Sequence, residues 1–407
     1  MYHKIVLFLL IISNVMNVFM DRTGVMGGRQ MIYVANAAAF VIALIYLFKR
    51  SFHVPKCYNP LKLFAVFFMV YFFWQYISPN KYFILNNYVR WIMNILFLFF
   101  FYFFEENEKG KRLMQIYIVT FIFECSSKIY NGSSYAAIAD LDKRVGGDTA
   151  SIGLALVVPL IFTFFKNKMG IVLYTICLAV SMVSLRRSSI LAILVAIPFI
   201  WPTLKQRVNK KYIYWGAIIS IFFLYKVWDF VGAKLLRRIF EYTDATSDLN
   251  TYGSGRTEFW RFLFKKYIDN WNWFLGDGLG GVYEAFSMHW VRNLSHAHND
   301  VLEILYTFGI VGLMAWFLFL YRSVYYVKRV CDFGNRKTFY CAMAVYIAVA
   351  ITSGCLLRAE MFPLSMAFGL LMQKQRRVEF SFTNKDNVEQ EHSHVDSENT
   401  NKRYLHS

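Results

Sequence analysis

Long apolar runs without a charged residue recur along this chain, and they limit the folds that it can adopt. Such runs cover residues 91–104, 191–201, 218–225 and 311–320. A soluble core cannot absorb all of them in a chain that is 57% hydrophobic and only 17% charged. Each run belongs to a segment long enough, or nearly so, to cross about 30 Å of hydrocarbon as a helix. The sequence therefore predicts an all-α integral membrane protein.

Hydropathy divides the chain into about twelve predicted transmembrane helices. The last is short and contains Pro363, so a re-entrant segment is the alternative there. Lys4 and the apolar residues 5–12 resemble a signal peptide, but no small-residue cleavage site follows, so we expect an uncleaved first helix. The predicted spans are 5–20, 31–48, 61–77, 91–104, 113–127, 151–165, 171–184, 188–201, 212–230, 301–321, 338–357 and 361–372.

Basic residues set the predicted orientation. With the N-terminus in the cytoplasm, every inner loop is rich in lysine and arginine, as the positive-inside rule requires. Residues 1–230 then hold helices 1 to 9, and residues 231–299 form a large extracytoplasmic loop with an interfacial helix. Residues 300–377 hold helices 10 to 12, and the polar residues 378–407 form a disordered cytoplasmic tail.

The net charge of +18 identifies the kind of partner to expect. The cations lie in short clusters between apolar spans, so anionic lipid head groups are a simpler partner than nucleic acid. The predicted outer segments, one of which holds Arg144, are also basic, and there arginine outnumbers lysine. Because arginine binds phosphate in a bidentate manner, we expect an outer cavity that holds a phosphorylated substrate. Head-group contacts and an adventitious excess of charge are the alternative.

A serine–arginine turn separates two predicted helices. Residues 184–189 read Ser-Leu-Arg-Arg-Ser-Ser and place Arg186 and Arg187 at a membrane boundary. Two arginines there are costly unless they meet water or an anion. An anion site and a turn whose side chains reach into the interface both fit this pattern.

A glycine–arginine–aromatic motif lies in the predicted outer loop. Residues 253–260 read Gly-Ser-Gly-Arg-Thr-Glu-Phe-Trp, and the glycines allow a sharp turn that presents Arg256. An amphipathic helix is predicted from Phe259 to about Trp273, along the membrane interface. The alternative is a solvated arginine in an ordinary loop.

A histidine motif opens the tenth predicted helix. Residues 295–303 read Ser-His-Ala-His-Asn-Asp-Val-Leu-Glu. Histidine suits proton abstraction near neutral pH, although a solvated or capping histidine is the alternative. His296 and His298 would diverge on a helix, so a metal site is not expected. Asn299, Asp300 and Glu303 either orient His298 or cap and charge the helix N-terminus.

Two other patterns carry no chemistry in this interpretation. Residues 276–280 read Gly-Asp-Gly-Leu-Gly, but no strand precedes them, so we expect no dinucleotide site. The six cysteines are scattered without a CxxC pair, which favours neither a disulfide framework nor a metal centre.

The order of the three motifs, followed by Gly-x-x-Gly-Leu at residues 309–313, resembles the O-antigen polymerase and ligase family. The resemblance covers roughly residues 140–321. It implies glycan transfer from a polyprenyl-diphosphate carrier, without a metal or other cofactor, on the outer side of the bacterial cytoplasmic (inner) membrane. It also implies diphosphate binding at Arg256 and at Arg187, with Arg186 as the alternative, and acceptor activation by His298. The supporting residues are His296, Asn299, Asp300 and Arg144.

These features predict a membrane glycosyltransferase that polymerises O-antigen or capsule repeat units. An O-antigen ligase that transfers finished polymer to lipid A core would carry the same motifs. A secondary transporter or lipid flippase is the alternative of another class, but the sequence has no internal repeat and no pair of broken, charged helices. A purely structural membrane subunit would leave the outer arginines unexplained. The expected partners are a polyprenyl-diphosphate-linked oligosaccharide, the bilayer and a chain-length regulator.

Overall fold

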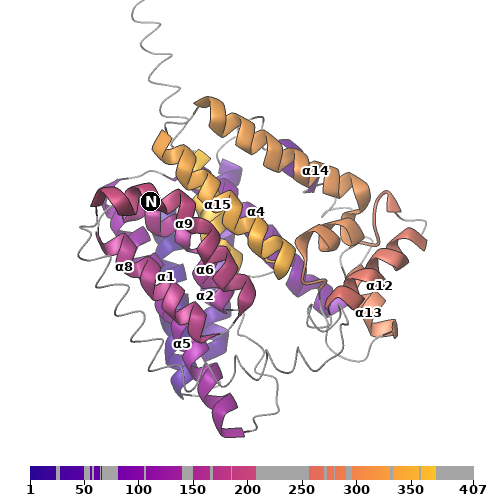
Figure 1. Ribbon diagram of the computed structural model, residues 1–407, viewed down its shortest axis with the longest axis horizontal. Coiled ribbons are helices and arrows are strands. Elements are labelled where there is room, and N and C mark those ends of the chain that lie inside the picture. The colour runs from indigo at the N-terminus through magenta and orange to yellow at the C-terminus, as the bar shows by residue number, and fades with distance from the viewer. Residues whose placement is uncertain are drawn as a thin grey trace, which may run out of the picture.

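Helices are the regular elements throughout the part of the chain that the computed structural model describes (Figure 1). That part comprises residues 1–23, 28–49, 56, 59–64, 66, 81–104, 107–139, 150–165, 168–184, 186–207, 256–269, 273–278, 280–289, 296–330, 333–356 and 359–372. The helices are α1 (Tyr2–Thr23), α2 (Gly28–Lys49), α4 (Lys81–Tyr102), α5 (Glu108–Ala139), α6 (Ala150–Leu156), α7 (Val158–Phe164), α8 (Lys168–Val183), α9 (Arg187–Arg207), α12 (Arg256–Asp269), α13 (Gly281–His289), α14 (Asp300–Val330), α15 (Phe333–Thr352), the short η3 (Ala359–Met361) and a helix over Phe362–Met372.

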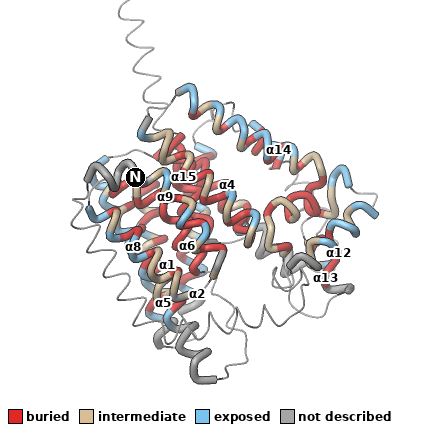
Figure 2. Tube along the Cα trace, in the orientation of Figure 1, coloured by how far each residue is buried: buried red, intermediate tan, exposed pale blue. Residues whose placement is uncertain are grey.

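Helices α1, α2 and α5 form one side of the bundle. Helix α1 packs against both of the others, and inward-facing residues such as Leu7 and Ala39 are fully buried. Large apolar side chains such as Phe8 and Val41 are instead exposed. Figure 2 shows a similar mixture on α14, where exposed residues are pale blue and buried ones red. Apolar residues on both faces are typical of helices whose outer side meets lipid.

Helix α4 lies in the core of the bundle. Residues 96–104 are buried on every face, as expected for an apolar helix surrounded by protein. The helix Phe362–Met372 packs directly on α4, because a Cβ at Gly369 would lie 2.9 Å from the backbone nitrogen of Tyr102. A small residue allows such a close approach between helices. The short last predicted span is therefore a helix buried within the bundle.

Three described helices are long and apolar enough to cross a membrane, over Tyr2–Phe19, Gln30–Lys49 and Asp300–Arg329. They agree with three of the predicted spans, and shorter apolar helices occupy most of the others. The predicted span 212–230 and most of 61–77 lie outside the described residues, as does the predicted tail 378–407. The count of twelve spans, the position of the outer loop and the domain bounds therefore stay predictions.

Two predicted spans end or divide differently in the structure. The span 151–165 is two short helices that meet at Val157, because Pro159 has no N–H to continue the helical ladder. The span 338–357 is wrong at its end, since α15 stops at Thr352. Gly354 has a φ of 65° and its N–H donates to the carbonyl of Val349, which is how a left-handed glycine closes a helix. That ending leaves residues 353–356 free to line a pocket.

Candidate functional site

The N-terminus of α14 begins immediately after a tight turn at residues 296–299. The Asn299 Oδ1 accepts hydrogen bonds from the N–H groups of Val301 (2.9 Å) and Leu302 (3.2 Å), so Asn299 is the N-cap of the helix. His298 precedes it with a φ of 55°, a left-handed conformation that is uncommon outside glycine. Of the two roles weighed for Asn299, capping is the one that these bonds support.

The two histidines lie side by side at this turn. The ring centroids of His296 and His298 are 4.2 Å apart with an angle of 58° between the planes. The expectation that their side chains diverge is wrong, because it assumed a helix and both residues precede α14. Within the described residues, no group of three His, Cys, Asp or Glu side chains is arranged to hold a metal ion.

Both backbone polar groups of Ala297 form hydrogen bonds to side chains. Its N–H donates to Oε2 of Glu303 at 2.7 Å, and its carbonyl accepts from Nε1 of Trp260 at 2.9 Å. Ala297 itself is buried against α12 and α13. Because Ala297 separates the two histidines, these bonds fix where both imidazoles are presented. Trp260 belongs to α12, which begins at Arg256, so the second and third sequence motifs meet here.

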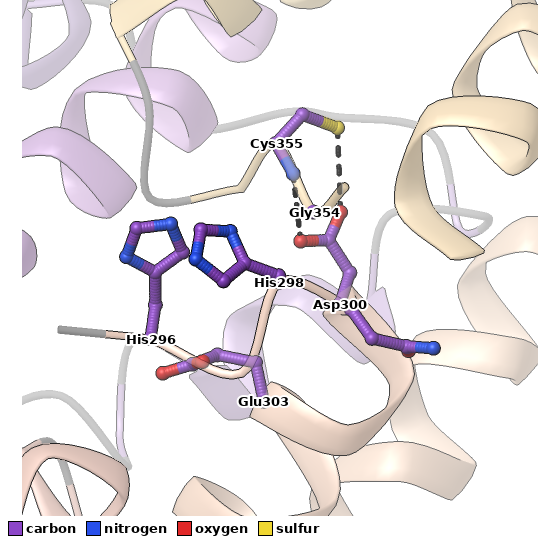
Figure 3. Close-up of a pocket in the computed structure, with 7 residues that line it drawn as sticks. His296, His298, Asp300, Glu303, Gly354 and Cys355 are labelled. Atoms are coloured by element: carbon purple, nitrogen blue, oxygen red, sulfur yellow. Dashed lines mark hydrogen bonds between the residues drawn. The ribbon is translucent and has the colours of Figure 1, made fainter. Parts of the chain in front are cut away.

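Asp300 joins the histidine turn to the segment that follows α15. Its Oδ1 accepts from the N–H of Cys355 (2.8 Å), and its Oδ2 accepts from the Cys355 thiol at 3.3 Å (Figure 3). Oδ1 also accepts from the N–H of Leu356 at 3.2 Å. Gly354 lies against the same turn, where a Cβ would be 3.0 Å from Asp300 Oδ1. Asp300 therefore anchors residues 354–356 beside the histidines.

The serine–arginine turn reaches the same place through Ser188. The Ser353 hydroxyl donates to the Ser188 hydroxyl at 2.8 Å, and both residues are buried. Within the turn, the Arg186 carbonyl accepts from the Ser189 hydroxyl at 2.9 Å, which shapes the start of α9 at Arg187. The serine–arginine turn is thus joined to residues 353–356, as Asp300 is, while Trp260 joins the glycine–arginine motif to the histidine turn.

A pocket opens between the histidine turn and residues 354–355 (Figure 3). Its volume, including space open to solvent, is about 190 Å³, which is smaller than a typical small-molecule pocket. It is lined by His296, His298, Asn299, Asp300, Glu303, Gly354 and Cys355. The two imidazoles among these residues suit a hydroxyl group that is to lose a proton.

The structure brings His296, His298, Asn299 and Asp300 together at this pocket. Arg186 lies partly buried in the neighbouring turn, while Arg187 and Arg256 are the first residues of α9 and α12. The side chains of Arg187 and Arg256, and the whole of Arg144, lie outside the described part of the chain.

Three residues of the site were missed in the sequence: Ser353, Gly354 and Cys355. They fell within a span interpreted as one continuous helix to residue 357. The available signal was the Ser-Gly pair inside an apolar run, because such a pair often marks a break or the end of a helix.

The glycine loop that begins at Gly276 packs against a break in α14. Helix α14 breaks at Gly309, and the carbonyls of Tyr306 and Thr307 accept from the N–H groups of Asp277 (2.9 Å) and Gly278 (3.0 Å). Non-helical backbone at membrane depth requires such partners. The Tyr267 hydroxyl donates to the Trp273 carbonyl beside this loop, and burial raises the pKa of that hydroxyl.

Residues 169–317 match the model of the protein family described as O-antigen ligase. The matched segment is therefore similar to that family. The match begins in α8, ends in α14 and contains all three motifs, so it confirms the resemblance found in the sequence. Proteins of the O-antigen ligase family are membrane proteins that act on lipid-linked glycans, and the match supports an enzyme of the O-antigen ligase or polymerase type. A search among curated proteins finds no match to the chain.

Proposed function

We propose that the chain is a membrane glycosyltransferase that polymerises a polysaccharide on the outer side of the bacterial cytoplasmic membrane. Its donor would be a glycan linked to polyprenyl diphosphate, and its acceptor a sugar hydroxyl. The observation that carries the proposal is the convergence of the serine–arginine, glycine–arginine and histidine motifs at one pocket, through the Ser188–Ser353, Trp260–Ala297 and Asp300–Cys355 hydrogen bonds.

His298 is the proposed general base. An acceptor hydroxyl in the pocket would give its proton to the imidazole as its oxygen attacks the anomeric carbon of the donor glycan. The bond between that carbon and the diphosphate oxygen breaks, and the polyprenyl diphosphate leaves with the electron pair. Base catalysis of this kind contributes about 10²- to 10⁴-fold, and positioning of the two sugars adds to it.

Arg187 and Arg256 are the proposed diphosphate ligands, with Arg186 as the alternative to Arg187. Arg187 and Arg256 each stand at the first turn of a helix, where unpaired N–H groups and the helix dipole also favour an anion. Guanidinium groups would stabilise the negative charge that grows on the leaving diphosphate, so this step requires no metal.

The deciding experiment uses the purified full-length protein in liposomes with a polyprenyl-diphosphate-linked repeat unit. We expect wild type to form longer carrier-linked chains and His298→Ala to form none while remaining folded and inserted. A His298→Ala variant with unchanged chain growth would remove His298 from the mechanism. Flipping of the lipid-linked glycan across the bilayer without any transfer would favour the flippase alternative.

The ligase is the second candidate, because the family match does not distinguish the two activities. Cells that lack the chain separate them when the surface glycan is resolved on a gel. Loss of a polymerase leaves lipid A core capped with at most one repeat unit. Bare core together with long carrier-linked polymer would overturn the polymerase in favour of the ligase. Altered chain length on deletion of a neighbouring regulator would identify the expected regulatory partner.

A further inference from the structure

An exposed apolar surface lies at the end of α12 and in the turn that follows it. We define this surface by five side chains that are each about half exposed or more: Phe264, Ile268, Trp273, Phe274 and Leu275. The opposite side of α12 is packed, since Leu263 is buried against α13 and the start of α14. Phe264 and Ile268 are one helical turn apart and Trp273–Leu275 are consecutive, and exposed apolar residues grouped in this way indicate a surface that meets an apolar phase or a partner.

The turn is fixed to the break in α14. The N–H of Val311 donates to the Phe274 carbonyl, and the N–H of Asp277 donates to the Tyr306 carbonyl. A Cβ at Gly276 would collide with Gly309 and Thr307, so the two backbones lie in direct contact. Trp273–Leu275 and Gly309 must therefore lie at about the same depth in the membrane.

That depth follows from the C-terminal end of α14, which is the cytoplasmic end in the predicted orientation. Tyr321 and Tyr325 are exposed there, and the Arg329 guanidinium lies 4.4 Å from the Tyr325 ring centroid, as expected at an interface between lipid and water. Gly309 precedes Tyr321 by twelve residues, or about 18 Å at 1.5 Å per residue, in a hydrocarbon core of about 30 Å. In the predicted orientation, the break at Gly309 would lie within the hydrocarbon of the outer leaflet.

We propose that the end of α12 and the turn Trp273–Leu275 insert into the outer leaflet, with lipid acyl chains as the occupant of the apolar surface. The charges beside it fit this partner, because Arg261 and Lys265 are exposed on α12 and would meet anionic head groups while the apolar residues lie deeper. The insertion anchors the outer loop in the plane of the membrane at a depth set by α14.

Spin labels test the inserted surface in the full-length protein. Cys57 and Cys331 are replaced, and the described native cysteines are buried, so single labels can be added at Phe264→Cys and Leu275→Cys. Glu284→Cys, exposed on α13, is the matched control. The protein is reconstituted in vesicles of phosphatidylethanolamine and phosphatidylglycerol. Collision of each label with oxygen and with a water-soluble nickel chelate is then measured.

The proposal expects labels at residues 264 and 275 to collide more with oxygen than with nickel, and the label at 284 to show the reverse. Nickel access at 264 and 275 equal to that at 284 would overturn the proposal in favour of a solvated surface. Protection from both reagents, together with dipolar broadening between labels, would overturn it in favour of a second copy of this chain. Because Phe264 and Leu275 lie on different elements, one labelled position still tests the proposal if the other variant fails to fold.

Discussion

The indole N–H of Trp260 donates a hydrogen bond of 2.9 Å to the carbonyl of Ala297, the residue that separates the two histidines of the pocket. Because Trp260 lies one turn from Arg256 on α12, this bond links the proposed diphosphate ligand to the proposed base. It also makes the position of the histidine turn depend on a helix of the outer loop.

Trp260→Phe tests that link. Phenylalanine keeps most of the packing but leaves the buried Ala297 carbonyl without this donor, so stability should fall by about 1–3 kcal/mol. The histidine turn would lose a fixed point, and we expect the transfer rate to fall by about 10- to 100-fold. The control is Trp273→Phe, because Trp273 is exposed and lies after the end of α12. This control should change neither the transfer rate nor the thermal midpoint. Equal activity of both variants would show that the bond does not position the base.

His298→Asn separates chemistry from folding. Asparagine tolerates the left-handed conformation that His298 adopts at a φ of 55°, so the turn should form and the thermal midpoint should stay close to wild type. Transfer should fall by about 10²- to 10⁴-fold because the base is lost. His296→Ala should be milder. If His298→Asn retained full activity and His296→Ala lost it, the two roles would be exchanged.

Arg187→Lys and Arg256→Lys test bidentate binding of diphosphate. Lysine keeps the charge but cannot form two parallel N–H bonds, so each variant should lose about 1.5–3 kcal/mol of interaction, or about tenfold or more in transfer. Arg186→Lys is the internal comparison, since only one of the adjacent arginines is expected to matter strongly. Full activity in the lysine variants alongside inactive alanine variants would mean that generic positive charge suffices.

Gly354→Ala tests the contact between residues 353–356 and the histidine turn. Alanine at a φ of 65° costs about 1–3 kcal/mol, and its Cβ would lie 3.0 Å from Asp300 Oδ1. We expect a lower thermal midpoint and loss of transfer together. Ser353→Ala, which only removes the hydroxyl bonded to Ser188, should be milder in both measurements. A Gly354→Ala variant with wild-type stability would contradict the close contact between Gly354 and Asp300.

The helical fold and the chemistry of the pocket were accessible from the sequence because they rest on local patterns. Apolar runs predict helices, and the Asn299 cap follows from a polar residue before an apolar run. The approach of residues 353–356 to Asp300 was not accessible, because it joins positions more than fifty residues apart by tertiary hydrogen bonds. The pairing of His296 with His298 was missed for a different reason. Their spacing was evaluated on a helix, whereas a left-handed residue turns both rings to one side.

The hydrogen bonds from Asp277 and Gly278 to Tyr306 and Thr307 also have a consequence for biosynthesis. The acceptors follow the donors along the chain, so the segment around residues 273–278 cannot reach its final structure until α14 has left the ribosome. Likewise, Asp300 can accept its hydrogen bonds from Cys355 and Leu356 only after those later residues have been synthesised. The pocket is thus completed only when nearly the whole chain has been synthesised, and a product that stops before residue 356 would enter the membrane with its histidines in place but without the wall that faces them.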